Sequence, residues 1–212
     1  MLAAPISYVI AILRFILANS LPCICNFVLP LFAKLFMLCA MQDVIRIFGI
    51  DPGSVAMGWG VVDSAGPRLS YVNAGVIRPP KGLARAPRLA HLLDNLDALL
   101  DQYRPDEAAV EETFVNANPR DALVLGQARG IALVAPARAG LEVFEYAANS
   151  IKKSVVGRGH ADKGQVQAMV RVLLPTSGEQ KADAADALAA AICHAHHRDM
   201  VRMKRTIQDK AS

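Results

Sequence analysis

The stretch IRIFGIDPGSVAMGWGVVD, residues 45–63, holds two apolar runs separated by Asp51 and the dipeptide Pro52-Gly53. A short run rich in β-branched residues that ends at Asp-Pro-Gly predicts a buried strand over 44–50, followed by a turn. A charge at the end of a buried strand is costly unless something pairs with it. The position of Asp51 therefore predicts a partner for its carboxylate.

The segments around this strand predict an α/β domain. Two further strands are expected over Trp59–Asp63 and Leu69–Ile77, with a turn at SAGP between them. Leucines spaced i, i+3, i+4 and i+7 predict a helix over 89–100 that Pro105 stops. The later segments are a strand candidate at 107–115, a long and nearly all-apolar helix at 117–140, a short strand at 141–147, and helical segments around Lys163–Leu174 and over Ala182–His197. This order implies a layered α/β fold with a mixed sheet.

Residues 1–40 differ in composition from the rest of the chain. They contain no Asp or Glu, only two charged residues, Arg14 and Lys34, and three of the four cysteines. A transmembrane anchor needs about 20 apolar residues, but Asn, Ser and Pro interrupt the stretch 15–33. A signal peptide has a basic start, whereas the first charge here is Arg14. We favour a third interpretation, an over-extended gene model with translation starting at Met41, and leave this apolar extension out of the fold.

The charge of the remaining chain is low. The whole chain carries +4 and residues 1–40 carry +2, so residues 41–212 carry +4 − 2 = +2. Such a charge does not identify a nucleic-acid binder. Basic residues gather at 152–163 and in a tail at 198–212, and each group also fits a solvated helix face or a tail. Cys193 is the one cysteine left, which excludes a disulfide framework and fits a reducing compartment.

Four carboxylates occur where an acid is not expected, whereas the others lie in polar surroundings. Asp51 ends the first strand, and Glu111 lies in the strand candidate AAVEET. Asp183 and Asp186 are spaced i, i+3 among alanines, so they share one helix face. Close carboxylates repel each other and raise a pKa, and a divalent cation removes that cost.

An all-oxygen ligand set points to Mg²⁺ or Mn²⁺ rather than to zinc. Carboxylates that converge from strand ends and a helix suit a two-metal phosphoryl-transfer site. Ordinary interpretations exist for single residues. Asp51 could form a turn, Asp183 could be a helix N-cap, and Glu112 is expected to be exposed on the opposite strand face.

Several segments in this order resemble the RuvC-type Holliday junction resolvases of the ribonuclease-H-like superfamily. They are GIDPG (49–53), VEETF (110–114), LGQARG (125–130), EYAANSIKKS (145–154), VVGRGHADKGQVQ (155–167) and DAADALAAA (183–191). The resemblance covers roughly residues 43–197. It implies a ribonuclease-H-like mixed five-stranded sheet flanked by helices. It also implies a cytoplasmic homodimer that binds four-way DNA junctions and nicks two strands symmetrically with metal-activated water, in DNA recombination and repair.

The resemblance also implies roles for individual residues. The family's catalytic, metal-binding acids fall on Asp51, Glu111, Asp183 and Asp186, with two Mg²⁺ ions per subunit, for which Mn²⁺ can substitute. Lys152 and Lys163 match lysines that approach the DNA backbone, and Phe114 matches an aromatic that stacks at the crossover, although a core phenylalanine fits Phe114 equally. Branch-migration helicase machinery of the RuvA and RuvB type is the implied partner.

Two further motifs have open interpretations. Gly126 and Gly130 are four apart on the apolar helix, and they fit either a dimer seam or packing against the sheet. The segment CHAHH is expected at a helix end, where histidines favour the dipole. Zinc binding by Cys193, His194 and His197 is not expected.

The expected domain organisation is a nuclease domain over 41–197, followed by the basic tail. Two other functions compete. One is a related ribonuclease-H-like nuclease that acts on other structured nucleic acids. The other is an actin-like phosphate binder, which needs a second glycine-rich loop and a longer chain, and neither is found. The four intact acids argue against a catalytically inactive DNA-binding module.

Overall fold

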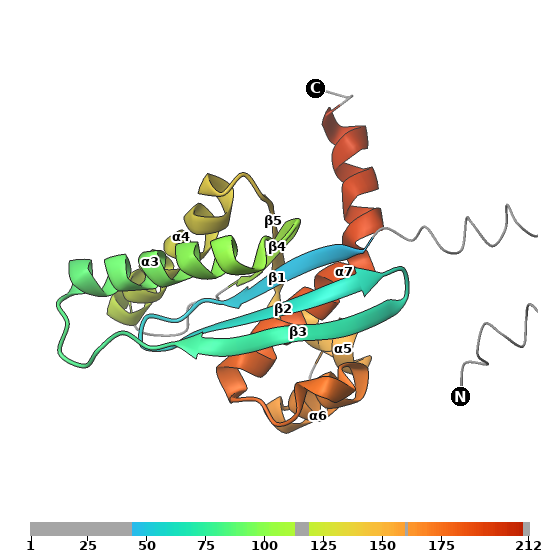
Figure 1. The fold of residues 1–212 in the computed structure, drawn as a ribbon, viewed down its shortest axis with the longest axis horizontal. Helices are drawn as coiled ribbons and strands as arrows, with labels where there is room; N and C mark the ends of the chain where they lie inside the picture. Colours follow the sequence, from blue (N-terminus) through green and yellow to red (C-terminus); the bar gives the residue numbers. More distant parts are fainter. Residues whose placement is uncertain (1–43, 113–118, 160, 210–212) are drawn as a thin grey trace, which may run out of the picture. The chain divides into compact units, whose positions relative to one another are not determined.

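The computed structural model describes residues 44–112, 119–159 and 161–209 (Figure 1). The apolar extension 1–40 and Phe114 lie outside these residues, so the expectations for them stay predictions. Within the described ranges, no helix is long and apolar enough to cross a membrane.

The described chain forms a five-stranded mixed sheet in the order β3-β2-β1-β4-β5. The strands β1 (Ile45–Asp51), β2 (Met57–Ala65) and β3 (Arg68–Ile77) form an antiparallel meander. The strands β4 (Glu107–Glu112) and β5 (Glu142–Ala147) extend the sheet in parallel with β1. The predicted mixed five-stranded sheet flanked by helices is confirmed.

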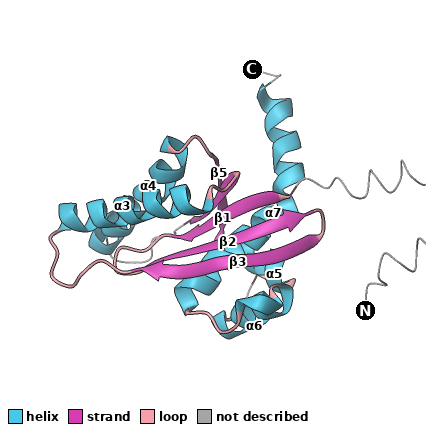
Figure 2. Cartoon of the chain, viewed as in Figure 1, coloured by secondary structure: helices cyan, strands magenta, loops and turns pink. Residues whose placement is uncertain are grey.

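Two helices cover one face of the sheet, α3 (Arg85–Tyr103) and α4 (Pro119–Arg138) (Figure 2). The leucine periodicity predicted α3 correctly, since Leu92, Leu96 and Leu100 are its buried residues. They pack with Phe48, Ile50, Trp59 and Val110 of the sheet and with three alanines of α4. This layer packs against one face of β1 and β4, the strands that carry Asp51 and Glu111.

The other face is covered by α5 (Ala148–Val156), α6 (Lys163–Leu173) and α7 (Ala182–Asp209), with a 3-10 turn at Pro175–Ser177 before α7. The structure adds α5, which the sequence did not separate from its surroundings. It also continues α7 beyond His197, the predicted end. The reason is that residues 198–209 contain no Gly or Pro that would stop a helix.

The helix α4 is only partly buried despite its apolar sequence. Its buried residues are Ala128, Ala132, Ala135 and Pro136. Leu123 is 60% exposed and Val134 is 48% exposed. A Cβ added at Gly126 or Gly130 would meet no atom within 4 Å. Packing of these glycines against the sheet, one of the two expected interpretations, is therefore wrong.

Candidate active site

The register of the sheet brings Asp51 and Glu111 to one edge. The strands β1 and β4 are parallel, and Ile50 is paired with Val110. Asp51 and Glu111 are the next residues along each strand, so both acids follow the same pair at the carboxyl ends of neighbouring strands.

Side-chain alternation places these two acids on the face covered by α7. Residues two apart on a strand share a face. Ile47 and Ala109 belong to the hydrophobic cluster beneath α5, α6 and α7. Asp51 and Glu111 have the same parity as Ile47 and Ala109, so they project toward α7 rather than toward α3 and α4.

Glycines in β1 and β2 allow α7 to approach the sheet closely. A Cβ at Gly49 would lie 2.1 Å from the carbonyl oxygen of Ala187, and one at Gly60 would lie 2.7 Å from the Leu188 side chain. The facing residues of α7 are themselves mostly alanines. Helix and sheet therefore meet almost backbone to backbone, which carries Asp183 and Asp186 to the edge that holds Asp51 and Glu111.

Asp183 lies in the first turn of α7, which begins at Ala182. It therefore sits inside the helix, and the alternative interpretation of Asp183 as an N-cap is wrong. Glu112, the neighbour of Glu111, is half-buried rather than exposed.

The carboxylates of this edge perturb one another. Burial, followed by the nearby charges of Glu111, Asp186 and Asp183, raises the pKa of Asp51 to about 8. Burial and the charge of Asp186 raise the pKa of Glu111 to about 7. Burial also raises the pKa of Asp186, against the opposing effect of Lys163. The structure thus brings the four predicted acids into one electrostatic cluster.

Basic side chains approach the cluster from three elements. Lys163, at the start of α6, places Nζ 3.7 Å from Oδ2 of Asp186. Lys152 of α5 lowers the pKa of Glu111 by its charge. Both predicted DNA-contacting lysines therefore lie at the acids. Arg78, which the sequence did not single out, follows β3 and places Nη2 3.1 Å from Oδ2 of Asp183.

The donor set of the cluster fits a hard divalent cation, because it offers carboxylate oxygens alone and because burial and mutual repulsion raise the pKa values of Asp51 and Glu111. Over the described ranges, no three His, Cys, Asp or Glu side chains are already gathered in a group that could hold a metal. Arg78 and Lys163 hold the two acids of α7. Metal binding therefore requires these side chains to rearrange.

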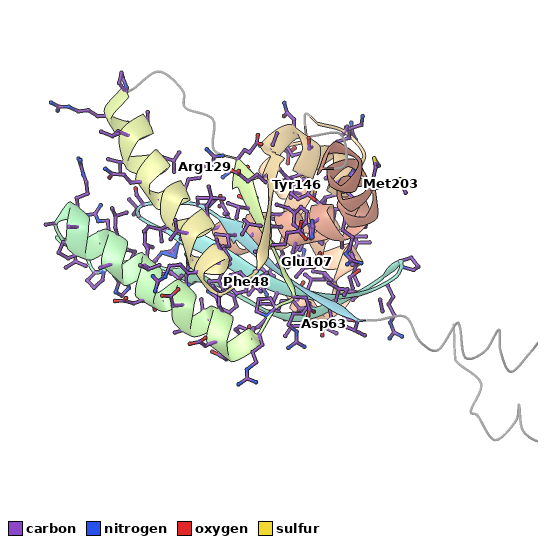
Figure 3. All side chains as sticks on the ribbon, turned by 90° about the horizontal axis from the view of Figure 1, so that it is seen from above. Phe48, Asp63, Glu107, Arg129, Tyr146 and Met203 are labelled. Carbon is purple, nitrogen blue, oxygen red and sulfur yellow. The ribbon has the colours of Figure 1, made fainter. Side chains whose placement is uncertain are left out.

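A buried polar network that was not predicted from the sequence lies at the opposite end of β4. Glu107, which begins β4, is 2% exposed. Its carboxylate is 2.7 Å from Nε2 of His194 and accepts hydrogen bonds from Arg198 at 3.1 and 3.2 Å. The Nδ1 atom of His194 is 2.7 Å from the hydroxyl of Tyr146. Figure 3 labels Glu107 and Tyr146, which lie on the neighbouring strands β4 and β5. The expectation that the remaining acids lie in polar surroundings is wrong for Glu107.

The same network corrects the interpretation of CHAHH. These residues lie inside α7 rather than at its end, and His194 is fully buried. Cys193 is a buried free thiol, and Nδ1 of His197 is 2.8 Å from the Cys193 carbonyl oxygen. In the part of the chain that the structure describes, these residues form no metal-binding group.

Comparison with known proteins identifies close relatives. The family model described as crossover junction endodeoxyribonuclease RuvC matches residues 47–194. The RuvC protein of Azorhizobium caulinodans is 54% identical over 164 residues, which cover 77% of this chain and 97% of the relative. The RuvC protein of Brucella anthropi is 51% identical over 168 residues, which cover 79% of this chain and 98% of the relative.

Solved structures give a consistent result. The chain is similar to Thermus thermophilus RuvC in complex with a Holliday junction substrate, with a TM-score of 0.68 and 32% identity, over 74% of this chain and 96% of that one. It also shares its fold with the yeast mitochondrial Holliday junction resolvase Ydc2, with a TM-score of 0.51 and 12% identity, over 85% of this chain and 91% of that one.

Proposed function

Because this chain belongs to the RuvC family of crossover junction endodeoxyribonucleases, we propose that it resolves four-way Holliday junctions by paired symmetric nicks. The observation that carries the proposal is the meeting of Asp51, Glu111, Asp183 and Asp186 at one edge of the sheet. Burial, followed by the charges of the other three acids, raises the pKa of Asp51 to about 8. An acid cluster of this kind binds divalent cations and suits hydrolysis of a phosphodiester.

The four acids hold Mg²⁺ in this proposal, with two ions per subunit and Mn²⁺ as a substitute. When bound by these acids, the ions would supply a lowered pKa for the attacking water and charge stabilisation at the leaving oxygen. Asp51 and Glu111 are fixed by rigid parallel strands, whereas Asp183 and Asp186 are fixed by α7. The contribution of the chain is to bring four carboxylates from three elements to one edge of the sheet, within reach of a shared ion.

The two lysines supply contacts to the DNA backbone. Lys152 and Lys163 both lower the pKa of Glu111 by their positive charge, so each ammonium lies within electrostatic reach of the acids. A phosphate that approached the acids would otherwise be repelled by them. The lysines offset this repulsion and place the backbone near the cluster. Phe114, which lies outside the described residues, keeps its proposed stacking role on the strength of its motif alone.

Paired nicking requires two active sites, which a C₂ homodimer provides. The exposed surface of α4 supports a dimer seam there. Leu123, Gly126, Gly130 and Val134 lie at helical spacing, with both apolar side chains exposed and open space beside both glycines. Small residues let a second helix approach closely. Branch-migration machinery of the RuvA and RuvB type is the proposed partner, on the basis of family membership.

Family membership also supports the proposed domain boundaries. The matched residues 47–194 fall inside the proposed nuclease domain 41–197. The residues after 197 begin as a continuation of α7, so a separate tail would start only beyond Asp209.

The test of the proposed function compares three labelled substrates: a synthetic four-way junction, a linear duplex and an RNA–DNA hybrid. We expect the wild-type chain to nick the junction in Mg²⁺ and to leave it intact in chelator. Preferential cleavage of the hybrid would support the alternative nuclease. Cleavage of none of the three substrates, together with binding of a labelled nucleotide in a separate assay, would support the phosphate binder.

A further inference from the structure

Arg78 is the basic residue at the acid cluster that neither the sequence motifs nor the proposed DNA contacts include. Its Nη2 atom donates a hydrogen bond to Oδ2 of Asp183 at 3.1 Å. Its side chain is 51% exposed, whereas that of Asp183 is 31% exposed. The contact therefore lies on the rim of the site, and the guanidinium can leave it without crossing the protein interior.

The backbone of Arg78 is held in place, so only its side chain is free to move. Ile77, the preceding residue, is buried and paired with Met57 across β2 and β3. Pro79 and Pro80 follow Arg78. A residue before proline is restricted to extended conformations, and proline fixes its own backbone angle. The guanidinium of Arg78 can therefore change position by rotation of its side chain, while its backbone stays at the end of the edge strand β3.

Arg78 and a divalent cation compete for the same carboxylate. A guanidinium keeps its charge at every physiological pH, so it cannot relieve repulsion by losing a proton. A cation bound to Asp183 would lie next to the positive charge of Arg78. Metal binding therefore weakens the contact between Arg78 and Asp183, and this contact in turn weakens metal binding.

The displaced guanidinium has a ready alternative partner. Arginine is well suited to phosphate, because its planar fork donates two parallel hydrogen bonds. A DNA strand whose phosphodiester lies at the acids presents neighbouring phosphates along the rim of the site. Lys163 differs from Arg78, because it approaches Asp186 only to 3.7 Å and its side chain is 76% exposed.

We propose that Arg78 is an exchangeable counter-ion, which neutralises Asp183 in the metal-free protein and moves to a DNA backbone phosphate when a divalent cation binds. The proposal rests on the proposed function for its DNA half only. Arg78 then couples metal binding to junction binding, so that each favours the other. It would be a positioning residue that acts on the order of assembly rather than on the reacting atoms.

Titration calorimetry with Mn²⁺ alone, without DNA, tests the metal half in the full-length chain. We expect Arg78→Gln to bind Mn²⁺ about two- to fivefold more tightly than wild type, the factor that loss of one exposed ion pair produces. Arg78→Lys, which keeps the charge, should give an intermediate affinity and also guards against a folding defect in the glutamine variant. The matched control is Arg68→Gln, which removes the same charge from the other, exposed end of β3. Unchanged or weaker Mn²⁺ binding by Arg78→Gln would overturn the proposal.

Fluorescence anisotropy with a labelled four-way junction tests the DNA half, in Ca²⁺ and in chelator. Ca²⁺ should strengthen junction binding by wild type about two- to fivefold more than it strengthens binding by Arg78→Gln, by the reciprocity of coupled binding. Equal strengthening in both proteins would refute the move to phosphate. Failure of wild type to cut junctions would instead refute the proposed function, and the calorimetry without DNA would still decide the metal half.

Discussion

The backbone carbonyl of Asp183 occupies the space in which a side chain on Gly58 would lie. A Cβ built on Gly58 comes within 1.9 Å of that oxygen, a distance that real side chains do not adopt. Gly58 is also the strand partner of Asp51 across β1 and β2. One glycine therefore sets the separation between the first turn of α7 and the strand that carries Asp51, and the positions of two proposed metal ligands depend on it.

Gly58→Ala should push the start of α7 away from the sheet. We expect a loss of about 1–3 kcal/mol of stability, typical of overpacking, together with slower junction cleavage and weaker Mn²⁺ binding. Thermal unfolding, nicking assays and calorimetry measure the three effects. Gly126→Ala is the matched control for stability, because open space surrounds Gly126 and alanine is favoured over glycine in a helix by about 1 kcal/mol. Wild-type metal affinity in Gly58→Ala would show that α7 tolerates the shift.

Asp51→Asn should abolish cleavage while junction binding survives, because the carboxylate holds metal and the lysines hold the backbone. We expect nicking to fall at least about a hundredfold, with an unchanged gel shift. A variant that nicked at the wild-type rate would place the active site elsewhere.

The raised pKa of Asp51 also predicts how stability depends on pH in chelator. The pKa is about 8 in the folded protein, against an ordinary value of 3.8. The contribution of Asp51 to the free energy of unfolding is therefore fully present below about pH 4 and is lost as the pH rises through 8. Asp51→Asn should remove part of that loss, so that the variant unfolds at a higher temperature than wild type at pH 8.5 but not at pH 4. Identical pH profiles would show that burial and the other acids do not raise the pKa of Asp51.

Glu107→Gln should destabilise the protein strongly, because it removes the carboxylate that pairs with the buried His194 and the half-buried Arg198. Removing one partner of a buried ion pair costs about 3–5 kcal/mol, and urea unfolding measures the change. The Glu107 hydrogen bonds from His194 and Arg198 outweigh its burial and lower its pKa to about 2. Its stabilisation is therefore present above about pH 4.5 and disappears as pH falls toward 2. Glu179→Gln, at an exposed residue, is the control and should change stability little.

Gly130→Leu should separate dimerisation from folding. Open space beside Gly130 accepts a leucine within one subunit, and leucine is favoured over glycine in a helix by about 0.8 kcal/mol, so the monomer should not lose stability. A second helix could no longer approach, so sedimentation should report a monomer at concentrations where wild type is dimeric. A cruciform plasmid should be nicked on one strand rather than on both. Ala90→Leu, on the exposed face of α3, controls for added hydrophobicity, and a dimeric Gly130→Leu protein would exclude α4 as the seam.

Lys152→Ala and Lys163→Ala should each weaken junction binding and reduce its dependence on salt. The slope of log affinity against log salt is negative, and each lost phosphate contact makes it less steep by about 0.9. Anisotropy between low and moderate salt measures the slope for each variant. Lys81→Ala, at an exposed residue after β3, provides a control for charge loss. A wild-type slope in both variants would remove these lysines from the DNA interface.

The sequence by itself predicted the five strands, the helices α3, α4, α6 and α7 and the four candidate acids, because these depend on local patterns, whereas α5 was missed. Each of these patterns involves residues only a few positions apart. Examples are the period of the leucines in α3, the β-branched run of β1 and the i, i+3 spacing of Asp183 and Asp186. The end of α7 was misjudged because histidines suggested a helix terminus where nothing interrupts the backbone.

Only the tertiary structure decided which distant residues meet. Gly58 and Asp183 are 125 positions apart, and their contact depends on how closely α7 lies on β2. Glu107 begins the strand predicted over 107–115 and gave no sign of burial, and it is buried because α7 brings His194 and Arg198 across it. Arg78 carries no motif, and it joins the acids because an edge strand ends beside the first turn of α7. Such contacts follow from the packing of whole elements, which no local pattern of residues encodes.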